Sequence, residues 1–452
     1  MVNSNGRLMR KLMGIVPLFI AAPMLLAACG GDTTPTTGAA ATATKGTTAA
    51  ATATTAMAAP TNTTGTASGG SEGVPTGSAN VTIWYGYTGA EAENFQKALD
   101  DLKTKNPDFK VTALAVPFDS LQSKFTTEAA TGAGPDVLLG ANDWAGPLAD
   151  AGLLADLGTM SNLSMYTANL IPSSLDVSKY NGKQVGITAN LKNVALYYNS
   201  DIVKTVPKTT DEMLTTASSV ATGNVKYGLA LNAGFYAAVG YNYAFGGKLF
   251  NADNKTVDLT TQGTQDWLNF YKKAAGTPGV FVKSGADSDI DTFFKTGQAA
   301  MVINGPWALG DYQKALGKDK VKVAVAPSTP SGGKFAPFVG GDVYYVNDAS
   351  KNKDAALALI GYMMSTPVQQ NFVNNAGQIS TNTKVDLTTN PALQGFVDQS
   401  KQGTPFPNFS AMSQVWTPGG DMITSVLDGK ADAATAAKTA NDAINTAIKA
   451  MP

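Results

Sequence analysis

The chain has 452 residues, enough for two or more folding units, and its 44% apolar residues suffice for large hydrophobic cores. The 33 basic and 34 acidic residues nearly cancel, and no basic stripe is present, so we expect no nucleic-acid partner. The absence of histidine and the single cysteine, Cys29, remove the Ser-His and Cys-His nucleophile pairs, the commonest metal ligand and any internal disulfide. We therefore predict no metal site and no cofactor, and we assign no catalytic residue.

The first 28 residues have the pattern of a bacterial export signal. Three basic residues precede an uncharged, mostly apolar run over 12–28, which is short for a stable membrane span and contains two prolines. The run ends in Leu-Ala-Ala followed by Cys29, which resembles the lipobox of bacterial lipoproteins. We therefore predict a lipoprotein signal peptide over 1–28 and lipidation of Cys29. An ordinary secretory signal with a chance cysteine is the alternative.

Residues 29–79 are dominated by Thr, Ala, Gly, Ser and Pro and have almost no large apolar side chains. Such a segment cannot bury enough surface to offset its chain entropy, so we predict a disordered tether. Acyl chains on Cys29 would anchor the mature protein to the bacterial cell membrane from outside the cytoplasm, without a membrane-spanning helix.

From about residue 80 the sequence alternates between predicted strands and predicted helices. The strands are expected at 81–85, 111–116, 136–139, 184–188, 194–198, 227–231, 299–303, 321–326 and 343–346. The helices are expected at 90–105, 121–130, 210–221, 235–245, 262–275, 307–316, 353–365, 368–374, 392–401 and 431–450. This alternation is typical of βαβ units and mainly parallel sheets.

The stretch 293–310 combines a helix end, a short apolar strand, an Asn-Gly-Pro turn and Trp307 at the start of the next helix. Ligands of open α/β sheets lie beyond the carboxyl ends of the strands, so Trp307 indicates a binding cleft. The alternative from spacing alone is that Trp307 fills a gap in a hydrophobic core.

Three of the five tryptophans, Trp144, Trp307 and Trp416, lie in segments flanked by Gly and Pro, which we interpret as loops. We expect Trp84, within a strand, and Trp267, on an amphipathic helix, to be core residues.

Small polar residues precede two of the loop tryptophans: Asp143 comes before Trp144, and Asn304 lies near Trp307. Flat aromatic faces beside carboxylate and amide groups suit a sugar, whose C–H face stacks on an indole and whose hydroxyls need paired donors and acceptors. No phosphate-binding loop, nucleophile elbow or calcium loop is present, and no spacing singles out a catalytic pair of carboxylates.

A set of short segments, in order, resembles the family 1 extracellular solute-binding proteins of ABC importers, which include the maltose/maltodextrin-binding proteins. The segments are VTIW (81–84), FTTEAATGAGPD (125–136), GLLA (152–155), YNGK (180–183), YN (198–199), residues 293–307, PFVG (337–340) and PNFSAMSQVW (407–416). Each motif is weak alone, but the ordered set spans the chain from about residue 80 to its end.

The resemblance implies an α/β, two-lobed, periplasmic-binding-protein-like fold of type II, with each lobe a mainly parallel sheet flanked by helices and with hinge segments between the lobes. The implied N-terminal lobe comprises 80–190 and 341–388, and the C-terminal lobe 191–340 and 389–452. The implied crossings lie near 188–192, 338–341 and 386–391. Solute held between the lobes would stabilise the closed form.

Carried over by position, Asp143 matches a sugar-hydroxyl acceptor of the family, and Tyr236, Trp307 and Trp416 match stacking aromatics. Trp144 falls where maltose-binding protein has a charged residue, and we include it among the ligand-binding candidates.

Other positions depart from the maltose-binding pattern. Gly140 replaces a stacking aromatic, Lys192 falls where maltose-binding protein has an acid, and Thr417 and Gly420 replace an aromatic and an arginine. We keep Lys192 as a ligand-binding candidate. The implied ligand is therefore an oligosaccharide rather than maltose in particular.

The same alignment places Tyr87, Phe118 and Gln122 on loops facing the cleft, and Asp342 just after a crossing segment, where it would offer a second carboxylate. We predict all four as ligand-binding residues, with ordinary loop or surface residues as the alternative.

The resulting hypothesis is a monomeric, lipid-anchored binding protein, not an enzyme, that delivers a carbohydrate to the permease subunits of an ABC transporter. Two alternatives stay open at this point. One is an exported carbohydrate-active enzyme that uses two carboxylates. The other is a binding protein for a different solute, such as a polyamine or a peptide.

Overall fold

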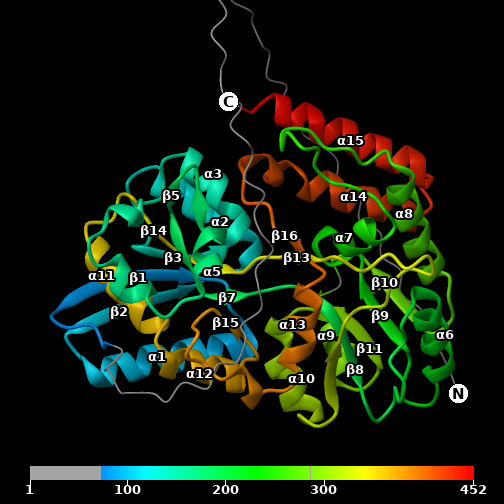
Figure 1. Cartoon of the computed structure of the whole chain (residues 1–452), viewed down its shortest axis with the longest axis horizontal. Helices are drawn as coiled ribbons and strands as arrows, with labels where there is room; N and C mark the ends of the chain where they lie inside the picture. Colours follow the sequence, from blue (N-terminus) through cyan, green and yellow to red (C-terminus); the bar gives the residue numbers. More distant parts are fainter. Residues whose placement is uncertain (1–72, 286, 452) are drawn as a thin grey trace, which may run out of the picture. The chain divides into compact units, whose positions relative to one another are not determined.

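The structure, a computed structural model, describes residues 73–285 and 287–451. The predicted signal peptide, Cys29 and most of the predicted tether lie outside the described residues. Two five-stranded sheets organise the described part (Figure 1). We call the unit built on the sheet that contains β1 the first lobe, and the unit built on the other sheet the second lobe.

The sheet of the first lobe has the strand order β2-β1-β3-β14-β6. Its strands are β1 (Ala79–Tyr85), β2 (Phe109–Ala115), β3 (Val137–Ala141), β6 (Gly186–Thr188) and β14 (Asp342–Val346). Strand β1 runs parallel to β2 and β3, whereas β14 is antiparallel to β3 and β6. Because β14 follows all the strands of the other sheet in the chain, the chain must return from the second lobe to complete the first.

Helices cover this sheet because their apolar residues recur at helical spacing. In α1 (Gly89–Lys105), Phe95, Ala98 and Leu102 lie on one stripe and are buried. The other helices of the first lobe are α2 (Phe118–Ala129), α3 (Ala145–Asp150), α4 (Leu163–Thr167), α5 (Pro172–Val177), α11 (Lys353–Met363) and α12 (Thr366–Asn375).

The sheet of the second lobe has the order β10-β9-β11-β8-β12 and is mixed in the same way. Strand β9 is parallel to β10 and β11, and β8 is antiparallel to β11 and β12. Its strands are β8 (Ala195–Asn199), β9 (Leu229–Asn232), β10 (Val280–Lys283), β11 (Met301–Asn304) and β12 (Val321–Ala324). The helices of the second lobe are α6 (Thr210–Val220), α7 (Phe235–Ala244), α8 (Gln262–Ala275), α9 (Asp287–Lys295), α10 (Leu309–Leu316), α13 (Leu393–Ser400), α14 (Trp416–Leu427) and α15 (Ala433–Lys449).

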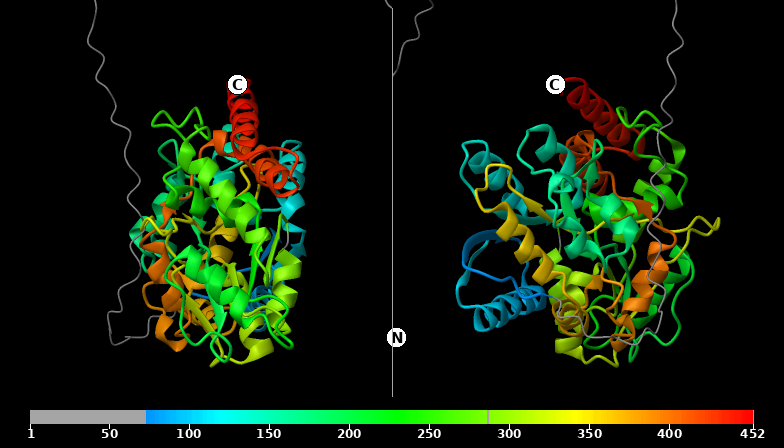
Figure 2. Two further views of the ribbon diagram at one scale, coloured as in Figure 1. Left: turned by 90° about the vertical axis from the view of Figure 1, so that its right-hand side faces the viewer. Right: turned by 60° about the vertical axis from the view of Figure 1, so that its left-hand side comes forward.

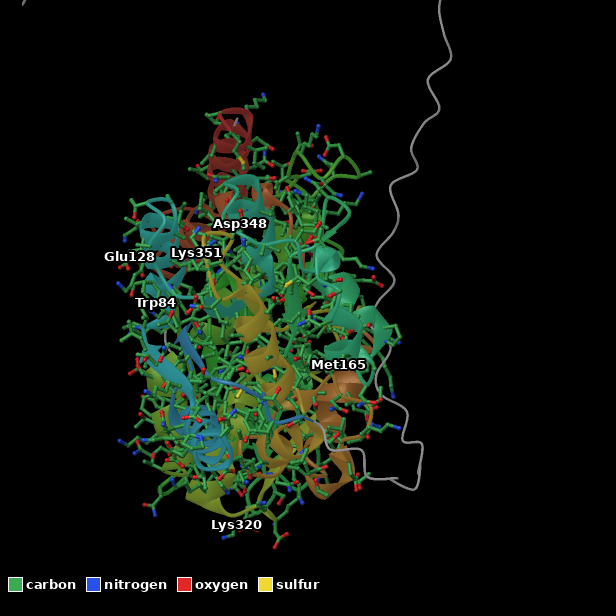
Figure 3. All side chains as sticks on the ribbon, turned by 90° about the vertical axis from the view of Figure 1, so that its left-hand side faces the viewer. Trp84, Glu128, Met165, Lys320, Asp348 and Lys351 are labelled. Carbon is green, nitrogen blue, oxygen red and sulfur yellow. The ribbon has the colours of Figure 1, made fainter. Side chains whose placement is uncertain are left out.

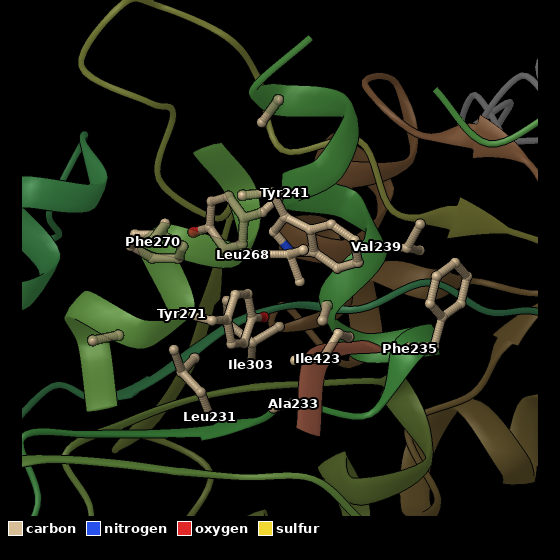
Figure 4. Packing of buried hydrophobic residues seen from close by; sticks show 14 of the residues in the cluster. Leu231, Ala233, Phe235, Val239, Tyr241, Leu268, Phe270, Tyr271, Ile303 and Ile423 are labelled. Carbon is tan, nitrogen blue, oxygen red and sulfur yellow. The ribbon is translucent and has the colours of Figure 1, made fainter. Parts of the chain in front are cut away.

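The main core of the second lobe lies between its sheet and the helices α7, α8 and α14 (Figure 4). Leu231 and Ile303 come from the strands, and Tyr241, Leu268 and Ile423 come from the three helices. All five side chains are buried. Burial of this extent accounts for the short apolar runs of the strands and fixes the sheet against its helices.

Short paired strands join the lobes (Figure 1). At one crossing, Lys192 and Gly340 exchange backbone hydrogen bonds of 2.8 and 3.0 Å. The paired segments are β7 (Asn190–Leu191) with β15 (Ile379–Ser380), and β13 (Phe338–Val339) with β16 (Thr404–Pro405). Backbone pairing between segments far apart in the sequence ties the crossings to one another.

The sequence-based predictions agree with most of these elements, with ends shifted by a few residues. Trp84 and Trp267 are buried core residues, as predicted. The short helices α3, α4 and α5 and the strand β10 were not predicted. Periodicity is a weak signal for such elements, because α3 and α5 each have only six residues.

The surface carries the charges that the cores exclude. Lys320, Asp348 and Lys351, labelled in Figure 3, are exposed charged residues, and Met165 is an exposed apolar one. Helix α15, red in Figure 2, packs along α14 and α8. Over 73–285 and 287–451, no helix combines the length and apolar character needed to cross a membrane.

We predict that Gly341→Ala strains the crossing. A Cβ atom at this position would lie 1.9 Å from the carbonyl oxygen of Asn190, a backbone atom that cannot move away cheaply. We expect the free energy of unfolding to fall by about 1–3 kcal/mol, measured by urea denaturation. Gly420→Ala is the control, because a Cβ there meets nothing within 4 Å and alanine favours the helix interior of α14. Equal stability of wild type and Gly341→Ala would contradict the prediction.

Candidate functional site

Each lobe contains a strand that ends in a 3-10 helix with a tryptophan. In the first lobe, β3 is followed by Asn142–Trp144 and then by α3. In the second lobe, β11 is followed by Gly305, the 3-10 helix Pro306–Ala308 and α10. The predicted strand, turn and helix around Trp307 is therefore present. Because both tryptophans sit just beyond a strand, the fold directs two indoles to the ends of the two sheets.

Each of these indoles lies over a glycine. A Cβ atom at Gly140 would lie 2.2 Å from Cζ3 of Trp144, and a Cβ atom at Gly305 would lie 2.0 Å from Cζ3 of Trp307. No other residue type leaves room for the indole in this position. The glycine at Gly140, which replaces a stacking aromatic of the family, is thus paired with the tryptophan four residues later.

Trp307 is only partly buried, unlike Trp267. Its ring lies 6.2 Å from that of Tyr236, and the Lys192 ammonium is 5.5 Å from its centre. The Tyr197 hydroxyl donates a 2.8 Å hydrogen bond to the Gly305 carbonyl and so holds the loop before Trp307. Trp307 therefore packs against the core on one side and faces a cation and an aromatic ring on the other.

Asn304 has a structural role and does not join this site. Its amide nitrogen donates to Asp291 Oδ1 and to the Tyr312 hydroxyl, both at 2.9 Å, and its oxygen accepts from Gly305 N–H at 2.8 Å. The expectation that Asn304 offers its amide to a ligand is replaced by this role, because these bonds hold its side chain.

Five aromatic side chains from separate segments of the second lobe and of the crossing strand β13 form a cluster, which we call the interlobe aromatic cluster because it is bonded to Asp143 of the first lobe: Tyr236, Trp307, Phe338, Phe406 and Trp416. Phe338 and Phe406 are stacked, with ring centres 4.8 Å apart and an interplanar angle of 9°. Tyr236 lies 5.7 Å from Phe406, and Trp416 lies 5.9 Å from Phe406. Phe338 belongs to the crossing strand β13, so the cluster begins at the hinge and extends into the second lobe.

Asp143 connects the first lobe to this cluster. Its carboxylate is buried and accepts a 3.2 Å hydrogen bond from Trp416 Nε1. Burial raises the pKa of Asp143 to about 7, and hydrogen bonds from its own backbone N–H and from Trp416 oppose that rise only in part. Near neutral pH both protonation states of Asp143 are therefore populated, and hydrogen bonds from hydroxyls would favour the ionised state by replacing the lost solvation.

Lys192 lies at the centre of a charged group beside the cluster. Its ammonium is 2.7 Å from Asp342 Oδ2, 3.8 Å from Glu91 Oε1 and 5.4 Å from the centre of the Tyr87 ring. Burial alone would lower the pKa of Lys192, but the carboxylates of Asp342 and Glu91 raise it above its usual value. Lys192 is therefore charged and held between two acids.

Asn190 ties this charged group to the crossing segment. Its amide nitrogen donates to Asp342 Oδ2 at 2.9 Å and to the Tyr87 hydroxyl at 3.2 Å, and its oxygen accepts from Asp342 N–H at 3.1 Å. Gln378 Nε2 donates a 2.7 Å hydrogen bond to Glu91 Oε1. All of these residues except Tyr87 and Glu91 lie on or next to crossing segments, so the charged group sits at the hinge.

The predictions for Phe118 and Trp416 as loop residues are wrong, and Gln122 lies in a helix, as the predicted helix over 121–130 requires, and not in a loop. Phe118 is the first residue of α2, and Gln122 lies one turn later in the same helix. Phe118 is 49% exposed, and its ring lies 5.1 Å from the ring of buried Trp144. Trp416 is the first residue of α14. A partly buried Gln122 and an exposed Phe118 place both side chains at the surface of the first lobe.

Sequence reasoning missed Glu91, Asn190 and Phe406. Glu91 precedes Phe95 by four residues and therefore continues the apolar stripe of α1, which is a detectable signal for a buried acid. Asn190 and Phe406 lack a local signal, because their roles depend on contacts with Asp342 and Phe338 that are distant in the sequence.

Comparison with known proteins places the chain in a family. The model of the family described as bacterial extracellular solute-binding protein matches residues 97–395, well over half of the chain. The chain belongs to this family. The maltodextrin-binding protein MdxE of Bacillus subtilis is 28% identical over 373 residues, which cover 78% of this chain and 87% of that protein.

A second relative and a solved structure are similar to the chain to a comparable extent. A maltooligosaccharide ABC transporter solute-binding lipoprotein of Streptococcus pneumoniae is 29% identical over 348 residues, covering 72% of this chain and 79% of that one. The structure of the Thermus thermophilus maltotriose binding protein bound with maltotriose matches with a TM-score of 0.74 and 29% identity, over 81% of this chain and 100% of that one.

These findings confirm the predicted two-lobed type II fold of periplasmic binding proteins, here with mixed sheets flanked by helices. The chain is an extracellular solute-binding protein of an ABC transporter. It is a binding protein and not an enzyme, so the alternative of an exported carbohydrate-active enzyme is set aside.

The raised pKa of Asp143 predicts a pH dependence of stability. An unfolded aspartate ionises near about pH 4. Between pH 4 and about 7 the folded chain keeps a proton on Asp143 that the unfolded chain loses. The contribution of Asp143 to the free energy of unfolding is therefore fully present below this window and is lost as the pH rises through it. We expect the stability of Asp143→Asn relative to wild type to increase by up to about 4 kcal/mol from pH 4 to pH 8.

Urea denaturation of both proteins at unit steps of pH tests this expectation. Asparagine keeps an oxygen that can accept from Trp416 Nε1, so the variant removes the titration and retains an acceptor. Two parallel curves of stability against pH would show that Asp143 does not titrate in this window.

Proposed function

We propose that this protein captures a maltooligosaccharide, or a related oligosaccharide, between its two lobes and delivers it to the permease subunits of an ABC importer. The observation that carries the proposal is the interlobe aromatic cluster, with the Asp143 carboxylate of the first lobe bonded to one of its indoles. The relatives named above for maltodextrin, maltooligosaccharide and maltotriose support the same class of ligand.

The chemistry of the cluster suits a sugar. Tyr236, Trp307 and Trp416 are only partly buried, so each retains an accessible portion of its ring. A pyranose would stack its C–H face on these rings, while its hydroxyls donate to the Asp143 carboxylate and accept from the Lys192 ammonium. A site with few matched polar groups among aromatic walls is typical of ligand pockets.

Closure follows from the division of these groups between the lobes. We propose that the units that move are 80–190 with 341–388, and 191–340 with 389–452, as the sequence predicts. Asp143 belongs to the first unit, and Trp307 and Trp416 belong to the second. A solute that contacts both units stabilises the closed form more than the open form, which is what drives a hinge motion.

The other predicted ligand-binding residues lie outside the aromatic cluster, and we propose a separate role for each group of them. Trp144 and Phe118 form a pair of rings on the first lobe, and we propose that they extend the stacking surface, with Gln122 beside them. The Tyr87 hydroxyl accepts a hydrogen bond from Asn190, and the Asp342 carboxylate is bonded to Asn190 and Lys192. We propose that Tyr87 and Asp342 take part in sugar binding chiefly by holding the Lys192 ammonium in position.

A cationic solute is the second candidate, because aromatic rings beside a buried carboxylate also bind amines. Identification of the solute that co-purifies with the full chain, by mass spectrometry, separates the two candidates. A glucose oligomer or another neutral oligosaccharide supports the proposal, and a polyamine or a peptide overturns it.

We predict that Trp307→Ala weakens the binding of maltotriose by about tenfold or more, because the variant loses a stacking face, and that the fold stays intact. Isothermal titration calorimetry measures the affinity, and thermal unfolding measures the stability. A large drop in unfolding temperature with unchanged affinity would show that Trp307 is a core residue.

Trp267→Phe is the matched control for that experiment. Trp267 is fully buried in the core of the second lobe, so its replacement lowers stability and leaves the affinity for maltotriose close to that of wild type.

We further propose that Cys29 carries the lipid that anchors the protein to the cell membrane. A relative is named as a lipoprotein, which supports this anchoring. Cys29→Ser in the full chain is expected to abolish incorporation of radiolabelled palmitate and to remove the protein from the membrane fraction. Thr36→Ser, within the predicted tether, is the control. Retention of the label in Cys29→Ser would contradict the proposal.

A further inference from the structure

We infer that Asp311 is an interlobe clasp: its carboxylate caps the amino end of α1 from the opposite lobe and favours the closed arrangement that holds the solute. Asp311 belongs to α10 in the second lobe, and α1 belongs to the first. The inference rests on the proposed function in one respect, namely that closure retains a solute.

The amino end of α1 lacks a cap from its own chain neighbours. The residue before the helix, Thr88, makes no side-chain hydrogen bond to it. The Ala90 N–H instead donates a 3.1 Å hydrogen bond to Asp311 Oδ1, across 221 positions of sequence. The first N–H groups of a helix are unpaired and carry partial positive charge, so a carboxylate is the favoured partner.

Glycine permits the close approach of the two helices. A Cβ atom at Gly89 would lie 2.1 Å from Asp311 Oδ2, and one at Gly310 would lie 2.8 Å from the Cβ of Ala90. Both glycines lie at the amino ends of their helices, so these ends of α1 and α10 approach closely, with no side chain between the backbone at Gly89 and the Asp311 carboxylate.

The clasp is coupled to the candidate site on both sides. Asp311 follows Trp307 by four residues through a continuous helical segment. On α1, Glu91 follows Ala90 directly and faces the Lys192 ammonium, which also lies 5.5 Å from the Trp307 ring. A shift of α1 relative to α10 would therefore move the cation and the indole relative to each other.

The contact lies at the edge of a buried core that the two lobes share, which includes Leu309 of α10 and Val373 of α12. A hollow of about 460 Å³ lies beside it and is lined by Glu93, Asn94 and Lys97 of α1 and by Gln313 and Lys314 of α10. The neighbouring ion pair between Lys314 and Glu93 is exposed, at 3.2 Å, and exposed pairs contribute little. The partly buried bond between Ala90 N–H and Asp311 is therefore the better protected of these two polar contacts between the helices.

The first test compares Asp311→Ala and Asp311→Asn with wild type in binding of maltotriose by the full chain. We expect Asp311→Ala to lower the affinity about five- to tenfold, mainly through faster dissociation, and Asp311→Asn to have a smaller effect because its oxygen still accepts. Asp319→Ala is the matched control, because Asp319 is exposed beyond the end of the same helix.

The second test uses Gly89→Ala, which places a methyl group where Asp311 stands. In the wild-type background it is expected to weaken binding about tenfold or more. In the Asp311→Ala background the same change is expected to cost much less, because the clash is gone, while any backbone strain at position 89 remains. Equal losses in the two backgrounds, or unchanged affinity in Asp311→Ala, overturn the clasp.

Amide hydrogen exchange separates failure of the clasp from failure of the proposed function. Wild type that binds no oligosaccharide overturns the proposed function. The clasp is then decided by the Ala90 amide, which is expected to exchange about tenfold faster in Asp311→Ala than in wild type or Asp319→Ala. Equal exchange in the three proteins overturns the clasp.

Discussion

The ion pair between Lys192 and Asp342 is the interaction on which the arrangement of the lobes depends. The two residues lie on neighbouring crossing segments, and their charged atoms are 2.7 Å apart in a mostly buried setting. Removal of either partner would leave a buried charge without its counterion, which is far costlier than loss of an exposed pair. The bonds from Asn190 and the nearby Glu91 extend this pair into the first lobe. The hinge is thus held by directional polar contacts and not by a shared apolar core alone.

The two lobes contain the same local arrangement of strand, 3-10 helix and α-helix beside a tryptophan. A buried strand ends, the chain tightens into a 3-10 helix, and a tryptophan emerges before the following helix. Local sequence is enough to predict this arrangement: the apolar run before Asn304, followed by Gly305 and Pro306, predicts the strand and the turn around Trp307. The antiparallel strand β14 could not be placed next to β3 in this way, because that pairing depends on a chain return that no local pattern encodes.

The failures of sequence reasoning have specific physical causes. Trp416 was assigned to a loop because Pro418, Gly419 and Gly420 resemble helix breakers. Pro418 lies in the first turn of α14, where no backbone N–H is needed, and Gly419 lets the helix approach Phe235 closely. Glu91 is a buried acid whose spacing continues the stripe of Phe95, but an acid within an apolar stripe does not by itself predict a partner as distant as Lys192. In both cases tertiary contacts outweigh the local conformational or burial preference of the residues.

The packing of Trp144 over Gly140 has a consequence for how this part of the first lobe can change. The two positions are coupled: any side chain at Gly140 displaces the indole, and a smaller residue at Trp144 leaves a gap above the strand. A variant with an aromatic at 140 would therefore require a second substitution at 144 to be tolerated. Change at these two positions must therefore proceed through paired substitutions, and the order in which they occur decides whether the intermediate folds well.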